Sequence, residues 1–349
     1  MMRESRCETA NPTCLLCGTP DCPIRASADE NAVRGAGFFY RLHQCSECGL
    51  QFIHPQPAPA ALEKLYGEGF YSEAKRDDLI SRLFARYEQL CYWDRFRIFR
   101  RQPDNLKLLD VGSGNGHFLA FMRRRGWQVS GVEWSRAGVE IARRQFDIDV
   151  FQGPVEDAAF PASHFDVVTL WHVLEHLPDP LETGKEIYRI LKPGGTIVVA
   201  VPNVESFEAV YFKEKWALLD LPRHLYGFSP RTIELLLHAA GLEVTRVEHF
   251  SLEYSVSLAT LDLLNLVGER NFMYELVKKR RRYAPEGSPR LLRNMCANIA
   301  FVPLALPMAM MIAAWSWLVR RGTSIAVVAH KPDVALRSRA VGAGKSQNV

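Results

Sequence analysis

The stretch LLDVGSGNGHFL, residues 108–119, decides the fold of this chain. An apolar run ends in Asp110, and glycines follow at 112, 114 and 116 before an apolar helical pattern resumes at His117. Alternate glycines permit positive φ angles and let a ligand approach the main chain without a Cβ in the way. A dinucleotide fingerprint, G-x-G-x-x-G, would place its third glycine at His117, and a carboxylate before the loop would repel a pyrophosphate. The stretch therefore favours a ligand that carries a cationic amino group.

The segments around this stretch alternate between strand and helix patterns from about 106 to 250. The strand patterns are KLLDVG, WQVSGVEW, IDVFQG, HFDVVTLW and TIVVAVPN, and helical patterns such as SRAGVEIARRQF lie between them. Such alternation indicates crossover connections and a largely parallel sheet. Upstream, the row from Leu83 to Arg101 predicts a helix that leads into this domain.

The composition is that of an ordinary soluble protein. The chain has 349 residues, of which 48% are hydrophobic and 23% are charged, with a formal net charge of +4. This length allows about two domains, and so mild a charge gives no reason to expect a nucleic-acid partner. The opening residues MMRESRCETANPT contain no apolar stretch of signal-peptide length, so we expect a cytoplasmic protein in a reducing compartment.

Several of these segments resemble one known family. LLDVGSGNGHFL is similar to the first motif of the class I S-adenosylmethionine-dependent methyltransferases, and the segments GVEW, HFDVVTLWHVLEHLPDP, ILKPGGTIVVAVPN and LPRHLYGFSPRTIELLLHAAGLEV resemble later parts of that family. The resemblance covers about 105–250 and, as a seventh strand, 323–331. It implies an α/β fold with a Rossmann-like, seven-stranded, mostly parallel sheet whose last strand is antiparallel, and it implies S-adenosylmethionine as the cofactor.

The resemblance also implies which residues hold that cofactor. Glu133 stands where the family's acid holds the ribose hydroxyls. The family often has an aspartate for adenine after the third strand, but this chain has Pro154 there, which leaves the Val155 amide and the side chain of Glu156 or Asp157. The implied cofactor-binding residues are Asp110, Gly112, Gly114, Gly116, Glu133, Trp134, Val155, Glu156 and Trp171.

Three histidines are candidates for catalysis. Methyl transfer to a hydroxyl needs an aligned nucleophile and a group that removes its proton, and histidine suits that task near neutral pH. His172 and the Glu175–His176 pair follow the fourth strand of the domain, at the sheet edge where ligands bind. His224 lies on a loop that faces the acceptor in the family. Each histidine could instead cap a helix or bond to the backbone; His224 and His176 are the leading candidates.

Two cysteine pairs predict a metal site. CLLCG at 14–18 and CSECG at 45–49 are C-x-x-C-G knuckles, and two such knuckles form a tetrahedral four-sulfur zinc site from Cys14, Cys17, Cys45 and Cys48. With four thiolate ligands no position stays open for water, so the zinc is expected to be structural. Cys22 is the one rival ligand. Some methyltransferases that act on sugars carry a similar N-terminal module, which covers the acceptor site. The remaining cysteines, Cys7, Cys91 and Cys296, are interpreted as incidental.

A long apolar run near the C-terminus predicts contact with a membrane. Residues 299–319 are long enough to cross a bilayer, but the strand pattern TSIAVVAHKP follows and must return to the sheet. Pro303 and Pro307 are therefore expected to break the run into a helical hairpin that enters one leaflet or packs against SVSLATLDLLNLVG. The basic run KKRRR at 278–282 would favour anionic headgroups. This predicts peripheral, monotopic attachment; the alternative is a buried dimer or core helix pair.

These observations divide the chain into four parts and suggest a function. The parts are a zinc-ribbon module (14–53), a helical linker or lid (54–104), a methyltransferase domain (105–250 with 323–333) and an apolar and basic helical insertion (251–322). The predicted activity is methyl transfer from S-adenosylmethionine, on the inner face of the membrane, to an oxygen of a small-molecule or lipid-linked acceptor, such as a sugar, a lipid or a glycan precursor. The alternatives are a catalytically silent scaffold that binds zinc and membrane, and an NAD(P)-dependent oxidoreductase.

Overall fold

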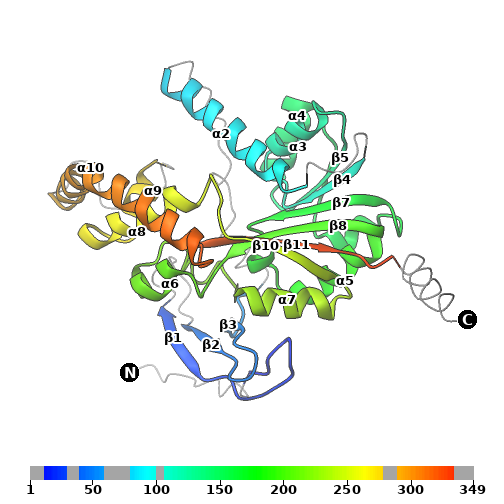
Figure 1. Cartoon of the computed structure of the whole chain (residues 1–349), viewed down its shortest axis with the longest axis horizontal. Helices are drawn as coiled ribbons and strands as arrows, with labels where there is room; N and C mark the ends of the chain where they lie inside the picture. The colour runs from blue at the N-terminus through cyan, green and yellow to red at the C-terminus, as the bar shows by residue number, and fades with distance from the viewer. Residues whose placement is uncertain (1–11, 30–38, 59–78, 100–105, 278–288, 334–349) are drawn as a thin grey trace, which may run out of the picture.

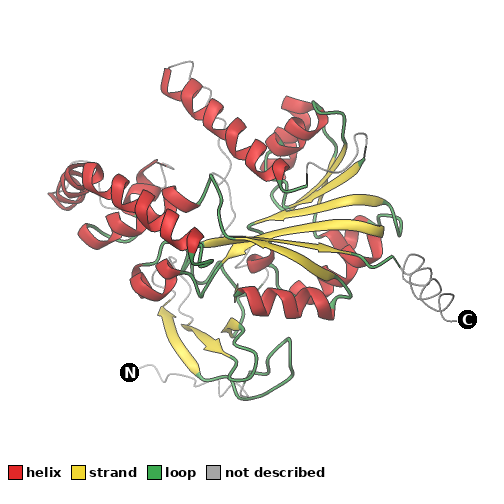
Figure 2. Cartoon of the chain, viewed as in Figure 1, coloured by secondary structure: helices red, strands yellow, loops and turns green. Residues whose placement is uncertain are grey.

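The centre of the molecule is a seven-stranded sheet (Figures 1 and 2), in a computed structural model that describes residues 12–29, 39–58, 79–99, 106–277 and 289–333. The strand order is β10-β11-β8-β7-β4-β5-β6, and β11 is antiparallel to both of its neighbours, whereas β8, β7, β4, β5 and β6 are mutually parallel. The strands are β4 (Lys107–Val111), β5 (Gln128–Glu133), β6 (Val150–Gln152), β7 (Phe165–Trp171), β8 (Leu191–Pro202), β10 (Glu243–Glu248) and β11 (Ser324–His330). This order confirms the predicted Rossmann-like sheet with an antiparallel last strand.

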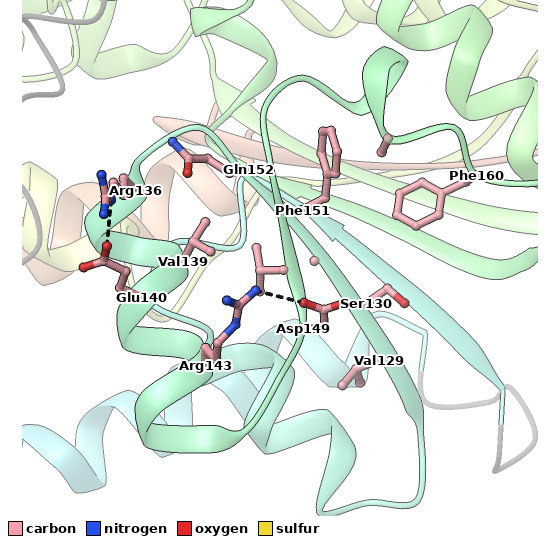
Figure 3. A pocket seen from close by; sticks show the side chains of 13 residues that line it. Val129, Ser130, Arg136, Val139, Glu140, Arg143, Asp149, Phe151, Gln152 and Phe160 are labelled. Carbon is pink, nitrogen blue, oxygen red and sulfur yellow. Dashed lines mark hydrogen bonds and ion pairs between the residues drawn. The ribbon is translucent and has the colours of Figure 1, made fainter.

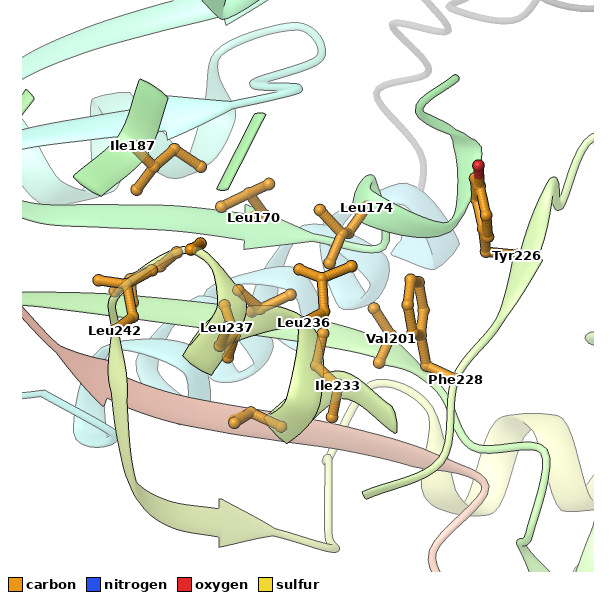
Figure 4. Packing of buried hydrophobic residues seen from close by; sticks show 14 of the residues in the cluster. Leu170, Leu174, Ile187, Val201, Tyr226, Phe228, Ile233, Leu236, Leu237 and Leu242 are labelled. Atoms are coloured by element: carbon orange, nitrogen blue, oxygen red, sulfur yellow. The ribbon is translucent and has the colours of Figure 1, made fainter. Parts of the chain in front are cut away.

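Helices cover both faces of the sheet (Figure 1). One face carries α2 (Leu79–Arg97), α3 (His117–Arg123) and α4 (Arg136–Phe146), and the other carries α5 (Pro180–Ile190) and α7 (Pro230–Ala239). Successive side chains of a strand point to opposite faces of the sheet. Leu108 packs against the helices of the first face and Leu109 against those of the second. Figure 4 shows the second face, where Leu170 and Val201 lie among the leucines of α7. Both faces of the sheet are therefore packed with apolar side chains, and a functional site is expected at the ends of the strands.

The N-terminal module forms a second sheet that borrows a strand from the main domain. Its order is β1-β2-β3-β9, with β1 (Ile24–Asp29), β2 (Phe39–Gln44), β3 (Gln51–His54) and β9 (Tyr226–Gly227). The strand β9 belongs to the loop that follows His224, and the amide of Ile53 donates to the carbonyl of Leu225 at 2.9 Å. The cysteine-bearing module and the His224 loop are thus joined by backbone hydrogen bonds.

A group of helices projects from the sheet between β10 and β11. They are α8 (Ser255–Val267), α9 (Phe272–Val277) and α10 (Pro289–Leu318), and α6 (Phe207–Phe212) packs beside them; short 3-10 turns are η2 (Val155–Ala158), η3 (Leu174–His176) and η4 (Lys213–Lys215). The basic run at 278–282 lies outside the described residues.

The predicted helical hairpin is wrong, because α10 is one continuous helix of 30 residues. Pro303 and Pro307 lie within it, both exposed. They are four residues apart and so share one face, on the side away from α8. The opposite side packs on α8 through Ala305 and Ala309, and this contact keeps the helix continuous where each proline removes one backbone hydrogen bond.

Candidate active site

The glycine loop between β4 and α3 has the backbone that the sequence predicts. Gly112, Gly114 and Gly116 have φ angles of 73°, 57° and 78°. A Cβ on Gly112 would lie 2.3 Å from Cγ2 of Val173, so no other residue fits there without movement. The amide of Gly114 donates to Oε2 of Glu133 at 2.8 Å, and the amide of Ser135 donates to Oε1 of the same carboxylate at 2.8 Å. The acid at the end of β5 is therefore fixed against the loop.

Asp110 lies at the base of this loop and is buried. Its Oδ1 accepts a hydrogen bond from Oγ1 of Thr169 on β7 at 2.6 Å. Burial raises the pKa of Asp110 to about 7, while Thr169 and the charge of Arg95 act in the opposite direction. A buried carboxylate with one partner is a ready acceptor for an ammonium group.

The other residues that the resemblance implies lie around the same edge of the sheet. Trp134 follows Glu133 and is 53% exposed, whereas Val155 is buried at the first position of η2. Oε1 of Glu156 accepts from Oγ1 of Thr183 on α5 at 2.5 Å, so this side chain already has a partner. Trp171 ends β7, and the guanidinium of Arg95 lies 5.0 Å from its ring centroid.

Two of the three candidate histidines meet in space. The rings of His176 and His224 are 4.7 Å apart, and the ligand atoms of these two residues and of Glu175 lie within 4.8 Å of one another. Nδ1 of His176 is 2.9 Å from the Arg223 carbonyl, which fixes the ring if that nitrogen carries the proton. Burial, followed by the charge of His176, lowers the pKa of His224 to about 4, so this imidazole is neutral at pH 7.

Glu175 lies beneath the histidine pair and is 0% exposed. Neither of its carboxylate oxygens has a partner with hydrogen-bond geometry among the described residues, although Nδ1 of His172 is 3.3 Å from Oε1. Burial acts to raise the pKa of Glu175, but the nearby histidines outweigh it and lower that pKa below its usual value. The result is a buried negative charge beside the histidine pair, and this charge acts to raise the pKa of His224 against the larger effect of burial.

His172 is held apart from the pair. Its ring packs against Tyr254 with centroids 4.1 Å apart, and its Nε2 is 3.0 Å from Oγ of Ser324 on β11. Its φ of 56° lies in the left-handed region, which is uncommon for a residue with a side chain. With both ring nitrogens near protein partners, His172 is placed to position its neighbours.

The four predicted zinc ligands form one cluster. Sγ of Cys14 is 3.5 Å from Sγ of Cys48, Sγ of Cys17 is 3.4 Å from Sγ of Cys45, and all four sulfur atoms lie within 4.8 Å of one another. A tetrahedral zinc ion with Zn–S bonds of about 2.3 Å needs sulfur atoms about 3.8 Å apart, so the thiols fit that ion. Cys22, the rival ligand, instead points its Sγ at the Thr19 carbonyl, 3.6 Å away.

A separate cavity lies along β5, β6 and α4 (Figure 3). Its polar rim consists of two surface ion pairs, Arg136 with Glu140 and Arg143 with Asp149. None of the residues that the sequence predicts for the cofactor lines this cavity. Asp110, Glu133 and Trp171, which the sequence predicts to bind the cofactor, lie instead near the carboxyl ends of β4, β5 and β7.

Sequence reasoning missed a partly buried cluster of charged residues near this edge. Arg95 on α2 pairs with Glu253 at 2.6 Å, and Asp94 accepts from the Leu252 amide at 2.9 Å. Glu253 immediately precedes Tyr254, which packs on His172. The helix pattern of 83–101 places arginines on α2 but does not indicate which of them turns inward, because the partner lies 158 residues away in the sequence.

Comparisons with known protein families and sequences agree with this arrangement of the site. A family model described as a methyltransferase domain matches residues 81–247. A ubiquinone biosynthesis O-methyltransferase from Pseudomonas aeruginosa (strain LESB58) is 31% identical over 190 residues, which cover 46% of this chain and 82% of that relative. The chain belongs to the methyltransferase family.

Other matches of this methyltransferase are shorter or more distant. The ubiquinone biosynthesis O-methyltransferase of Actinobacillus pleuropneumoniae serotype 5b is 32% identical over 134 residues, and the match spans 35% of this chain and 57% of that relative's length. A S-adenosylmethionine-dependent methyltransferase from Archaeoglobus fulgidus has a similar fold with a TM-score of 0.44 at 19% identity, over 73% of this chain and all of that one. The buried Asp110, the fixed Glu133 and the open glycine loop fit S-adenosylmethionine as the cofactor of a methyltransferase domain.

Replacement of Glu133 by alanine should weaken the binding of S-adenosylmethionine by at least about 100-fold, because a carboxylate that accepts two ribose hydroxyls contributes about 1.5–3 kcal/mol for each charged hydrogen bond. Glu156→Ala should have a smaller effect, since the Val155 amide would remain to bind the adenine. Isothermal titration calorimetry measures both, with Glu140→Ala on the exposed side of α4 as the control. Equal affinities for the wild type and Glu133→Ala would contradict the assignment.

Cofactor affinity should also depend on pH through Asp110. Its pKa of about 7 in the ligand-free protein means that the carboxylate is protonated below that pH and ionised above it. Only the ionised form attracts an ammonium group, so affinity should fall by up to about tenfold per pH unit below 7. Asp110→Asn keeps an acceptor for Thr169 and should bind weakly at every pH. An affinity of the wild type that stays constant from pH 5.5 to 8 would refute this prediction.

Proposed function

We propose that this methyltransferase transfers a methyl group from S-adenosylmethionine to a hydroxyl oxygen of a lipid, a lipid-linked sugar or another small acceptor at the cytoplasmic face of a membrane. The observation that carries the proposal is the pair of imidazoles at His176 and His224, at the same end of the sheet as the cofactor loop. Relatives that are named O-methyltransferases support oxygen as the methylated atom.

The cofactor residues have distinct tasks in this proposal. Bound S-adenosylmethionine supplies an electrophilic methyl group on a sulfonium. Asp110 binds the amino group of the methionine moiety, and Glu133 accepts the ribose hydroxyls while it holds the Gly114 amide. The Val155 amide and the side chain of Glu156 bind the adenine. The exposed Trp134 and the end of β7 at Trp171 flank the cofactor.

His224 is the general base in this proposal. A neutral imidazole can accept the proton of the acceptor hydroxyl as the methyl group moves. The charges of Asp220 and Glu175 then stabilise the imidazolium, since both raise the pKa of His224 against the effect of burial. His176 lies against His224 and orients it, while His172 positions Glu175.

The cysteine cluster supports a structural zinc ion in residues 14–53. Four thiolates leave no open position, so the ion would contribute folding free energy rather than chemistry. Through β3 and β9 this module would hold the loop that carries His224 against the site. The helical linker of 54–104 contributes α2, which covers the cofactor edge through Arg95.

Titration calorimetry with S-adenosylmethionine and separately with NADH tests the proposal. We expect micromolar binding of S-adenosylmethionine alone, followed by transfer of tritium from the labelled methyl group into a bacterial lipid extract. Binding of NADH alone would favour an oxidoreductase. Binding of neither ligand would favour a scaffold, and either result would overturn the proposal.

A further inference from the structure

We infer that α8 and α10 form a platform that lies flat in one leaflet of an anionic membrane and presents the sheet edge that carries the active site to the lipid. This deepens the proposed function by naming the surface from which the acceptor would come, and it rests on that function only for the identity of the acceptor. The platform consists of residues 255–267 and 289–318.

The outer face of α10 is apolar. The most apolar 18 residues of this helix have a mean hydropathy of 1.9, yet only 17% of that stretch is buried. Met310 is 63% exposed, Met311 is 65% exposed and Trp317 is 58% exposed. The large apolar side chains exposed along α10 are Leu292, Ile299, Leu304, Leu306, Met310, Met311, Trp315, Trp317 and Leu318. A soluble helix normally turns such residues inward.

The inner face of α10 is instead small and polar. The residues of α10 that are buried are Asn294, Asn298, Ala305, Ala309, Ala313 and Ser316. Their polar atoms have partners: Asn294 Nδ2 donates to Glu269 Oε1 at 3.0 Å, and Ser316 Oγ donates to Glu208 Oε2 at 3.4 Å. Small residues that allow close approach, with polar side chains bonded between helices, are typical of helix contacts within lipid. The helix pair is thus arranged for an apolar environment outside it.

The connections of the platform exclude a single crossing of the membrane. The insertion leaves the sheet at the end of β10 and returns at the start of β11, and these two strands pair with each other. Only five residues separate Leu318, the end of α10, from Ser324, the start of β11. Both ends of the platform therefore stay on the side of the sheet, and α10 can enter one leaflet but cannot cross both.

The platform is connected to the sheet at the same edge as the active site. β10 is parallel to β8, because both are antiparallel to β11, so the insertion leaves from the carboxyl edge of the sheet. That edge also carries Asp110, Glu133 and the histidine pair. The segment between β10 and α8 contacts the site directly, through Glu253 on Arg95 and Tyr254 on His172. A lipid acceptor could enter sideways from the leaflet without leaving an apolar environment.

Charge selects an anionic surface. The sequence from 289 to 322 contains four arginines and no acidic residue, and one of the four, Arg290, pairs with Glu269. Arg293 near the start of α10 and Arg320 and Arg321 just after its end are exposed. Trp315 and Trp317, close to the second pair, suit the headgroup level. Each basic residue near an anionic surface contributes about fivefold in affinity, so the arginines at both ends favour such lipids over neutral ones.

Flotation with vesicles tests the inference on the full chain. We expect the wild type to float with vesicles of phosphatidylglycerol and phosphatidylcholine and to bind pure phosphatidylcholine at least about tenfold more weakly. The double variant Met310→Gln/Met311→Gln, which removes apolar contact without adding charge, should lose at least about tenfold in affinity for the anionic vesicles. The matched control is Leu235→Gln, at a 40% exposed leucine on α7, outside the platform.

Further readouts separate the possible outcomes. Brominated lipids should quench tryptophan fluorescence of the wild type but not of the double variant, and both should bind S-adenosylmethionine equally. A wild type that fails to float, or a double variant that floats like the wild type, would overturn the inference. A third outcome would also overturn the inference. If the wild type does not bind vesicles but forms a dimer without detergent, and the double variant is monomeric, the exposed face of α10 binds a second copy of this chain instead. Vesicle binding without any binding of S-adenosylmethionine would overturn the proposed function alone.

Discussion

Replacement of His224 by alanine is expected to lower kcat by about 10²–10⁴-fold, the usual contribution of a general base, and to leave the Kd of S-adenosylmethionine unchanged. His224 lies against His176 and beside the buried Glu175, and it is not among the residues assigned to the cofactor. Its loss removes the proton acceptor but no cofactor contact. His176→Ala should have a smaller effect, because it removes a neighbour that orients the ring. Single-turnover methyl transfer and calorimetry measure the two quantities separately.

The pH dependence gives a second readout for His224. Burial and the charge of His176 lower its pKa from 6.5 to about 4. A base works in its unprotonated form, so at saturating cofactor kcat should persist at pH 5–6, where an ordinary histidine would be mostly protonated. His238→Ala, at an exposed histidine on α7, is the control. Turnover of His224→Ala within twofold of the wild type would remove this residue from the mechanism.

Extraction of zinc, or the change Cys45→Ser, should abolish methyl transfer while the binding of S-adenosylmethionine survives. The module of residues 14–53 is too short to form a large core of its own, and structural zinc in small modules contributes about 10–16 kcal/mol of apparent binding free energy. Without the ion, β3 would no longer hold β9, and the hydrogen bond from the Ile53 amide to Leu225 would be lost. The His224 loop would then leave the site, whereas the cofactor loop between β4 and α3 would keep its place.

Hydrogen exchange gives a readout for this coupling that does not depend on activity. The amide of Ile53 and the residues of β9 should exchange faster after chelation, and the amides of Gly112 and Ser113, which bond to the Val132 carbonyl, should not. Cys296→Ser, at an exposed cysteine of α10, is the control and should retain one zinc ion per chain. A metal-free protein with unchanged exchange and full turnover would disprove the coupling, and one tightly bound zinc ion in Cys45→Ser would make Cys22 a ligand.

Most of the fold could be predicted because its signals are local. Strand and helix periods, the glycine loop after Asp110 and the caps at Asp179 and Ser229 all act within a few residues; Asp179 accepts from the amides of Leu181 and Glu182, as an N-cap should. The edge of the sheet that carries the predicted cofactor residues could also be predicted, since the carboxyl ends of parallel strands lie at one edge of a sheet. The prolines of α10 misled the prediction, because a local helix-breaking tendency was outweighed by packing on α8.

The sequence by itself therefore determined the parallel sheet, the open loop that fits S-adenosylmethionine and the four thiols that fit zinc, since spacing and residue type are enough for these. Only the tertiary structure decided that β9 joins the N-terminal sheet, that Arg95 turns inward to Glu253, and that α10 hides its polar residues and exposes its apolar ones. These features depend on contacts between segments that lie far apart in the chain, where the free energy of burial and of charge pairing, rather than local propensity, selects the partner.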